Sequence, residues 1–106
     1  MLETKTERIV TPARNILGSL RLPGDKSISH RYALLSALAG GTTKLTNFST
    51  GADCASSLGC AAALGATVTR RDDGAIEIVG SGELKAADAP LDCGNSGSTM
   101  RMLTGL

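Results

Sequence analysis

The sequence predicts an α+β fold, a β-α-β-α-β-β unit in which two helices pack against one mixed sheet. Two stretches, 27–39 and 52–64, carry apolar residues at helical spacing, and glycine follows each of them. Shorter stretches typical of strands precede, separate and follow these helices. The last two strands flank Asp72-Asp73-Gly74, which is a strong hairpin signal.

The first strand is expected within Asn15–Leu22, where apolar and polar residues alternate until Pro23. The first helix is expected over Ser27–Ala39, with Gly40-Gly41 as its C-terminal cap. Its spacing predicts one buried face, formed by Ile28, Tyr32, Leu35 and Ala39, with Leu34 and Leu38 beside it.

The remaining elements continue the same alternation. Thr42–Phe48 is rich in threonine and predicts a strand, and Ala52–Leu64 predicts the second helix. That helix has a stripe of small apolar residues, namely Cys54, Leu58, Ala61 and Ala62. The hairpin strands are expected over Thr67–Arg71 and Ala75–Val79, and a brief strand over Leu91–Cys93.

This reading divides the chain into three parts. Residues 1–17 form an N-terminal segment, residues 18–93 form the β-α-β-α-β-β unit, and residues 94–106 contain the start of a further helix. The last seven residues, Met-Arg-Met-Leu-Thr-Gly-Leu, open an apolar helix without a stop signal. We therefore expect the chain to be a fragment of a longer protein.

Composition excludes several classes of function. The formal net charge is +1 with one Tyr, one Phe and no Trp, so we expect neither a nucleic-acid partner nor a membrane partner. The N-terminus has no apolar core of a signal peptide. The three cysteines, Cys54, Cys60 and Cys93, form no C-x-x-C pair, so we expect free thiols in a reducing cytoplasm and no metal site.

The stretch Leu22–Arg31, Leu-Pro-Gly-Asp-Lys-Ser-Ile-Ser-His-Arg, is the most informative one in the chain. A Pro-Gly turn leads into a helix start crowded with hydrogen-bond donors, and Lys26 and Arg31 add two positive charges there. The free N–H groups at a helix start favour an anion. The alternative is a capped helix with a solvated first turn. We expect His30 to make a plain hydrogen bond near this start rather than to act as a general base.

A second stretch, Gly94–Arg101, repeats this design with two glycines, three hydroxyl side chains and an arginine at another helix start. Alone it is a weak signal, but two such starts in one chain predict a shared anionic ligand. Other functions fail on spacing, because Asp25 stands where a P-loop needs glycine and no nucleophile elbow occurs.

These two stretches resemble the 5-enolpyruvylshikimate-3-phosphate synthase family. The first decapeptide is highly specific for it and the second motif moderately so. The similarity runs from about Gly18 to the end and includes Ala-Leu-Gly-Ala-Thr-Val at 62–67. The resemblance implies that residues 18–93 are one of six such units in a two-domain fold. It also implies that the strand in residues 1–17 belongs with the other domain.

The resemblance further implies a cytoplasmic, monomeric transferase that needs no cofactor and no metal. Its reaction moves the carboxyvinyl group of phosphoenolpyruvate to the 5-hydroxyl of shikimate 3-phosphate and releases phosphate, in aromatic amino-acid biosynthesis. The residues implied to bind these substrates are Lys26, Ser27, Arg31, Asn95, Gly97 and Arg101.

Within this set, Lys26 is implied to contact both substrates, and Ser27 and Arg31 shikimate 3-phosphate. Gly97 is implied to offer its N–H to phosphoenolpyruvate, near the place where glyphosate binds. Ser98 departs from the threonine that is commoner in the family, which affects the shape of the pocket.

The catalytic acid and base are expected beyond Leu106, so this chain alone is expected to be inactive. For Asp25, Asp53 and Asp92 we expect capping or salt-bridge roles. Two alternatives stay open. One is the related transferase that acts on UDP-N-acetylglucosamine, and the other is a self-folding structural fragment without a function of its own.

Overall fold

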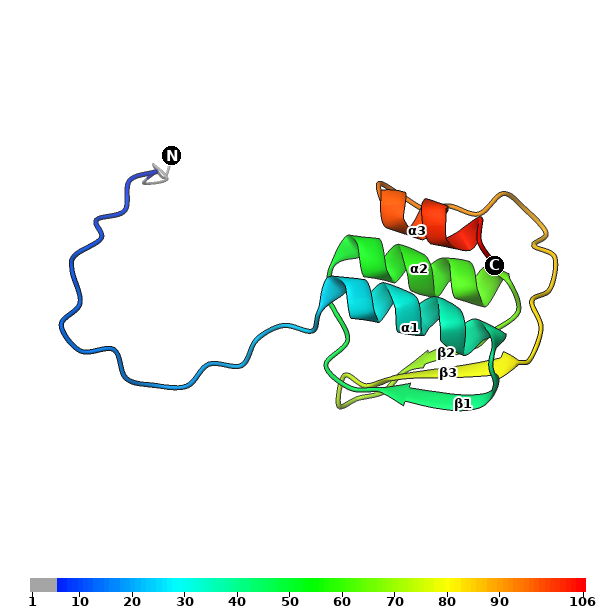
Figure 1. Cartoon of the computed structure of the whole chain (residues 1–106), viewed down its shortest axis with the longest axis horizontal. Coiled ribbons are helices and arrows are strands. Elements are labelled where there is room, and N and C mark those ends of the chain that lie inside the picture. The colour runs from blue at the N-terminus through cyan, green and yellow to red at the C-terminus, as the bar shows by residue number, and fades with distance from the viewer. Residues whose placement is uncertain (1–5) are drawn as a thin grey trace, which may run out of the picture.

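The computed structural model describes residues 6–106, which form three helices and one three-stranded sheet. The elements, in chain order, are α1 (Lys26–Leu38), β1 (Gly40–Leu45), α2 (Ala52–Ala63), β2 (Thr67–Arg70), β3 (Ile76–Ser81) and α3 (Gly97–Leu103). Figure 1 shows the three helices stacked on one side of the sheet and an extended N-terminal arm leading away from it. The predicted α+β class is confirmed.

The sheet has the strand order β1-β3-β2, and both pairings are antiparallel. Ile78 in the central strand lies opposite Thr43 on one side and Val68 on the other. The predicted hairpin between β2 and β3 is confirmed, and Gly74 turns the chain there with φ at +85°. The prediction of a mixed sheet is wrong for residues 6–106, because both strand pairings there are antiparallel.

That first strand, Asn15–Leu22, is not formed. Its backbone lies outside the sheet, and Leu20 and Leu22 are 80% and 69% exposed. Strand stability depends on ladder hydrogen bonds and a packed face, and alternation of residues alone provides neither. The brief strand predicted over Leu91–Cys93 is also absent, and these residues form a loop.

The core lies between the sheet and the first two helices. Ile76 and Ile78 of β3 are almost fully buried. They pack with mostly small residues from α1, from α2 and from the turn after α2. These residues are Leu58 and four alanines, Ala33, Ala37, Ala61 and Ala66. The third helix, α3, packs on α1 and α2 and makes no contact with a strand of the described chain. A core of small side chains therefore brings α1 and α2 close to the sheet and to each other.

The predicted buried face of α1 is wrong. Ile28, Tyr32 and Leu35 are 49%, 52% and 58% exposed. The residues that α1 buries are instead Ser29, His30, Ala33, Leu34, Ser36 and Ala37. Apolar residues lie on both sides of this helix, so spacing alone did not distinguish them. In α2 the predicted stripe is confirmed at Cys54, Leu58 and Ala61, whereas Ala62 is exposed.

Several boundaries of these elements differ from the predicted ones. The predicted cap Gly40-Gly41 is wrong, since both residues belong to β1, which ends at Leu45 and not at Phe48. Ala39 ends α1 in an extended conformation, so the chain passes directly from helix to strand. The α2 helix begins at Ala52 as predicted and ends at Ala63, one residue early.

Candidate anion-binding site

The start of α1 is set by Asp25. Its backbone is extended, and its Oδ1 accepts a hydrogen bond of 2.7 Å from the backbone N–H of Ile28. Its carbonyl oxygen accepts from both the N–H and the hydroxyl of Ser29, at 3.1 and 2.7 Å. Asp25 is thus an N-cap, as predicted, and makes Lys26 the first helical residue. Lys26 therefore stands at the positive end of the helix dipole.

Lys26 forms an ion pair with Asp53 in the first turn of α2, with 2.6 Å between Nζ and Oδ2. The carboxylate of Asp53 raises the pKa of the Lys26 ammonium, chiefly by accepting its hydrogen bond. The Lys26 side chain is still 57% exposed, so it is open to a ligand as well. The salt-bridge role predicted for Asp53 is confirmed.

The start of α3 is built by a turn that begins at Asp92. Its Oδ1 accepts a 2.8 Å hydrogen bond from the N–H of Gly94, whose φ of +56° favours glycine. Ser96 follows as the N-cap, and its Oγ accepts a hydrogen bond of 3.1 Å from the N–H of Thr99. These bonds fix the glycine-rich loop, and Gly97 becomes the first residue of the helix.

Arg101 folds back over Gly97. A Cβ atom at Gly97 would lie 2.6 Å from Nη1 of Arg101, which is closer than van der Waals contact allows. A side chain at position 97 would therefore displace the guanidinium. The structure thus places two of the predicted site residues, Gly97 and Arg101, against each other at the start of α3.

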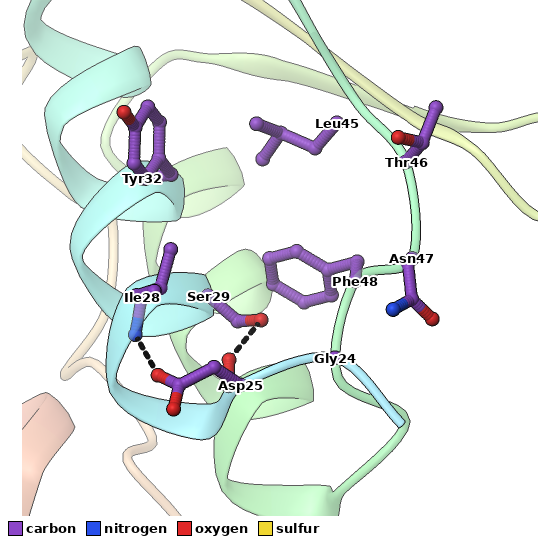
Figure 2. Close-up of a pocket in the computed structure, with 9 residues that line it drawn as sticks. All are labelled: Gly24, Asp25, Ile28, Ser29, Tyr32, Leu45, Thr46, Asn47 and Phe48. Atoms are coloured by element: carbon purple, nitrogen blue, oxygen red, sulfur yellow. Dashed lines mark hydrogen bonds between the residues drawn. The ribbon is translucent and has the colours of Figure 1, made fainter. Parts of the chain in front are cut away.

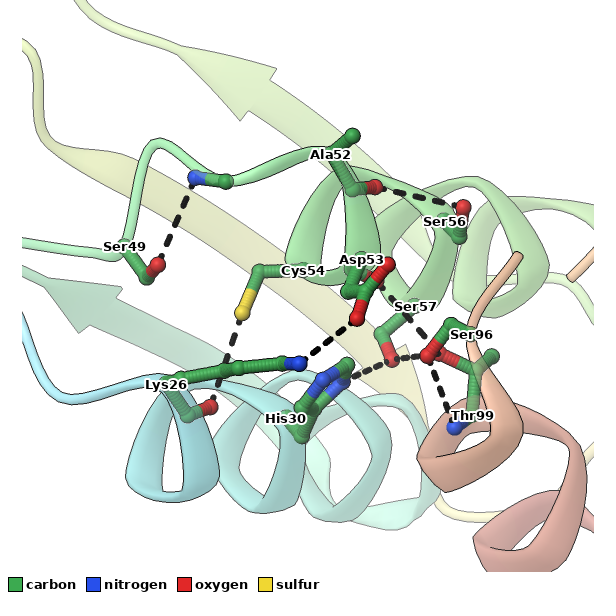
Figure 3. A network of polar contacts seen from close by, with 11 residues as sticks. Lys26, His30, Ser49, Ala52, Asp53, Cys54, Ser56, Ser57, Ser96 and Thr99 are labelled. Atoms are coloured by element: carbon green, nitrogen blue, oxygen red, sulfur yellow. Dashed lines mark hydrogen bonds and ion pairs between the residues drawn. The ribbon is translucent and has the colours of Figure 1, made fainter. Parts of the chain in front are cut away.

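The N-termini of all three helices lie at the same end of the molecule (Figures 1 and 3). Lys26 at the start of α1 reaches Asp53 at the start of α2. The carbonyl of Asp53 accepts a hydrogen bond of 3.4 Å from Thr99 near the start of α3. Helix N-termini carry partial positive charge, so their convergence favours an anion at this end.

The predicted site residues differ in their exposure. Gly97 is half-buried, and the others, Lys26, Ser27, Arg31, Asn95 and Arg101, are exposed. Arg31 lies one turn further along α1 and lines an apolar hollow of about 350 Å³ with Leu34 and Met102. No hydrogen bond or ion pair joins Arg31 to the other predicted site residues in the described part of the chain. The structure therefore brings the helix starts together and leaves Arg31 at their margin.

A line of buried polar groups runs beneath these helix starts (Figure 3). Nδ1 of His30 lies 2.6 Å from the hydroxyl of Ser57, which lies 2.8 Å from that of Thr99. The hydrogen-bonding role predicted for His30 is confirmed. The sequence reasoning missed Ser57, and it identified Thr99 only as one of the hydroxyl groups at the start of the last helix. Ser57 stands three residues after Cys54 and next to Leu58 in the apolar stripe of α2, and that position was the available signal.

A pocket of about 170 Å³ lies between α1 and the segment after β1, and Figure 2 shows the residues that line it. Its lining contains the apolar side chains of Ile28, Tyr32 and Phe48, and its one charged residue is Asp25. The Asp25 carboxylate already caps the helix. This pocket therefore lacks the positive charge that an anionic ligand requires.

Three further observations concern a cysteine, metal binding and membrane crossing. Burial raises the pKa of the Cys60 thiol to about 11, so Cys60 is a protonated thiol at neutral pH. Across residues 6–106, no three His, Cys, Asp or Glu side chains gather as a metal site would require. In the same residues, no helix has the length and apolar character needed to cross a membrane.

The sequence and the fold both match one family. The model of the family described as EPSP synthase (3-phosphoshikimate 1-carboxyvinyltransferase) matches residues 10–106. The chain belongs to the EPSP synthase family. It is 63% identical over 98 residues to a 3-phosphoshikimate 1-carboxyvinyltransferase of Koribacter versatilis, and 50% identical over 103 residues to one of Solibacter usitatus.

These matches cover most of this chain and a small part of the relatives. The Koribacter match takes in 92% of this chain and 23% of the relative, and the Solibacter match 94% and 24%. A solved EPSP synthase from Acinetobacter baumannii superimposes with a TM-score of 0.76 at 40% identity, over 83% of this chain and 20% of that one. The chain thus spans about a quarter of the length of these curated relatives.

Proposed function

We propose that this chain forms the part of a 3-phosphoshikimate 1-carboxyvinyltransferase that gathers its two anionic substrates, shikimate 3-phosphate and phosphoenolpyruvate. The reaction transfers the carboxyvinyl group to the 5-hydroxyl of shikimate 3-phosphate and releases inorganic phosphate. The observation that carries the proposal is the meeting of three helix N-termini around Lys26 in a chain of this family.

The first chemical requirement of this reaction is positive charge where the two substrates bind. Each substrate carries a phosphate and a carboxylate, so bringing them together costs electrostatic energy that cations and oriented N–H groups must offset. The exposed ammonium of Lys26 is placed to interact with both, and Asp53 keeps it charged and oriented. Ser27 and Arg31 are assigned to shikimate 3-phosphate.

The second helix start is assigned to phosphoenolpyruvate. Gly97 offers its backbone N–H, Asn95 lies on the exposed loop before it, and Arg101 adds charge beside Gly97. Ser98, the residue after Gly97, has a hydroxyl group and lacks the methyl group of a threonine. We assign the proton transfers to residues outside this chain, and we place the working enzyme in the cytoplasm as a monomer.

The first test measures binding to the 106-residue chain by NMR. Titration with shikimate 3-phosphate is expected to shift the amides of Lys26, Ser27 and Gly97 together, and Lys26→Ala is expected to abolish these shifts. Lys44→Ala removes an exposed lysine from β1 and serves as the matched control. Shifts that survive Lys26→Ala, or that appear equally with the UDP-sugar substrate of the related transferase, would contradict the assignment.

The second test measures turnover. Phosphate release is expected from a chimera in which this chain replaces the corresponding quarter of the Koribacter relative, and not from this chain alone. In the chimera, Lys26→Ala is expected to weaken the use of both substrates, because one ammonium serves two anions. A loss confined to one substrate would refute the shared role of Lys26. Steady turnover by the isolated chain would refute the placement of the proton transfers.

A further inference from the structure

Four polar side chains form a continuous line through the three helices, and the proposed function uses none of them. His30 of α1 meets Ser57 of α2 at 2.6 Å, and Ser57 meets Thr99 of α3 at 2.8 Å. Thr99 in turn lies 2.7 Å from the hydroxyl of Ser96, the N-cap of α3. All four residues are buried, with exposures between 0% and 3%.

The acceptors at the end of the line give it a direction. The carbonyl of Asp53, 3.4 Å from Thr99 Oγ1, can only accept, and Ser96 Oγ lies 2.7 Å away. The single hydroxyl hydrogen of Thr99 is directed toward Ser96 Oγ, the nearer of these two acceptors. Ser57 must then donate to Thr99, and Ser57 in turn accepts its hydrogen bond from Nδ1–H of His30.

The other ring nitrogen supports the same tautomer. Nε2 of His30 is buried and has no hydrogen-bond partner among the described residues. A protonated Nε2 would leave a buried N–H unpaired, and in the imidazolium it would also bury a charge near the Lys26 ammonium. A bare Nε2 avoids both, which favours the neutral ring with its proton on Nδ1.

We propose that His30, as the neutral Nδ1–H tautomer, is a positioning residue that holds residues 93–99 against the start of α1 through Ser57 and Thr99. These residues form the loop before α3 and its first turn. They include Asn95 and Gly97, and the start of α1 carries Lys26. The inference rests on the proposed function for the identity of the ligand, shikimate 3-phosphate. His30 is 1% exposed, so it acts through its neighbours and not by contact with the ligand.

Two substitutions distinguish positioning from mere packing. In His30→Asn the amide N–H₂ comes near the place of Nδ1 and can donate to Ser57, but it does not titrate. In His30→Gln the amide group comes near the place of Nε2 and leaves Ser57 without its donor. Ser57→Ala breaks the line in the middle and leaves His30 in place.

The first readout does not depend on any substrate. Nitrogen-15 NMR of the imidazole in the wild-type chain is expected to show a protonated Nδ1 and a bare Nε2. The amides of residues 95–99 are expected to keep their chemical shifts in His30→Asn and to move in His30→Gln and Ser57→Ala. A protonated Nε2, or unchanged amides in all three variants, would overturn the proposal.

The second readout is the affinity for shikimate 3-phosphate. We expect His30→Asn to stay within about threefold of wild type, and His30→Gln and Ser57→Ala to lose about tenfold or more, the effect of one lost buried hydrogen bond. The wild-type affinity is expected to fall as His30 becomes protonated at acid pH, and His30→Asn is expected to lack that step. Equal affinities in His30→Asn and His30→Gln would refute the positioning role.

The two readouts also separate this inference from the proposed function. If the wild-type chain binds no shikimate 3-phosphate, the proposed function fails, and the tautomer and the loop amides still decide the role of His30. If the substrate binds and the imidazole carries its proton on Nε2, the proposed function stands and the inference about His30 is wrong.

Discussion

At the scale of single residues, the hydroxyl of Thr99 connects buried polar side chains from α2 and from the start of α3. It is fully buried and lies between Ser57 and Ser96, within reach of the Asp53 carbonyl. Thr99→Val keeps the shape of the side chain and removes the hydroxyl, so Ser57 and Ser96 lose a partner. We expect a loss of about 1–3 kcal/mol in the free energy of unfolding, measured by urea denaturation.

Thr99→Ser is the matched control for that measurement. It keeps the hydroxyl and removes one methyl group, which costs about 0.8 kcal/mol in lost apolar burial. The valine variant is therefore expected to be the less stable of the two. The reverse order would show that the methyl packing, and not the hydrogen-bonded hydroxyl, is the larger contribution of Thr99.

His30 makes the free energy of unfolding depend on pH, and this contribution can be measured separately from that of other groups. Burial lowers the pKa of His30, and the Lys26 ammonium lowers it further, while Asp53 of α2 acts in the opposite sense. In the unfolded chain the histidine pKa is about 6.5. Below that pH the unfolded chain binds a proton that the folded chain does not, so stability is complete above about 6.5 and falls as the pH decreases.

The measurement compares wild type with His30→Asn between about pH 5 and 7, where histidine titrates and most carboxylates do not. The free energy of unfolding of the wild-type chain is expected to decrease on acidification, and that of the variant to change less. Parallel curves would mean that His30 has the same pKa in both states and that its burial does not penalise the charged form.

At the scale of elements, the contact between β3 and the end of α1 depends on Gly80. A Cβ there would lie 2.1 Å from the carbonyl oxygen of Ala39 and 2.4 Å from that of Ser36. These are backbone atoms, so the helix end would have to move. Gly80→Ala is expected to lower the melting temperature strongly, because strand and helix would separate and the packing of Ile78 would loosen.

Gly59 provides the opposite case within α2. It is exposed in the middle of the helix, and a Cβ there would meet no atom within 4 Å. Alanine at this position reduces the backbone entropy lost on folding, so Gly59→Ala is expected to stabilise the chain by about 0.5–1 kcal/mol. Thermal denaturation of Gly80→Ala and Gly59→Ala tests whether steric contact or helix propensity determines the effect of alanine on stability at each position.

The elements also show what a sequence can predict about a fold of this kind. The second helix and the hairpin were predictable, because their signals are local: a stripe at Cys54, Leu58 and Ala61, and an Asp-Asp-Gly turn. The buried face of α1 was not. Ile28 and Tyr32 have the expected spacing, but α2 and β3 pack on the side that carries Ala33 and His30, and only tertiary contacts reveal this.

The candidate site divides in the same way. The two stretches around Lys26 and Gly97 were visible in the sequence, because glycine, hydroxyl and basic residues at a helix start have a local physical meaning. Lys26 pairs with Asp53 and His30 with Ser57, each across 27 positions of the sequence, and Ser57 meets Thr99 across 42. Such contacts depend on how three helices are arranged, which no local pattern specifies.

At the scale of the whole molecule, the folded part and the N-terminal arm are physically distinct (Figure 1). Residues 6–22 are all exposed, and Ile9, Ile16 and Leu17 are each about nine-tenths exposed. One hydrogen bond, from Asn47 to the carbonyl of Leu22, links this arm to the remainder. The arm therefore contributes almost nothing to the stability of the folded part.

A chain that begins at Gly18 is accordingly expected to melt within about 2 °C of one that begins at residue 6, since residues 6–17 provide far less than 1 kcal/mol of stabilising contact. Removing residues 1–25 takes away Asp25, whose carboxylate and carbonyl hold the first turn of α1. The loss of this N-cap costs about 1 kcal/mol, so the shorter chain is expected to melt several degrees lower. Calorimetry of both shortened chains measures these melting temperatures. Equal melting temperatures would show that α1 does not depend on its cap.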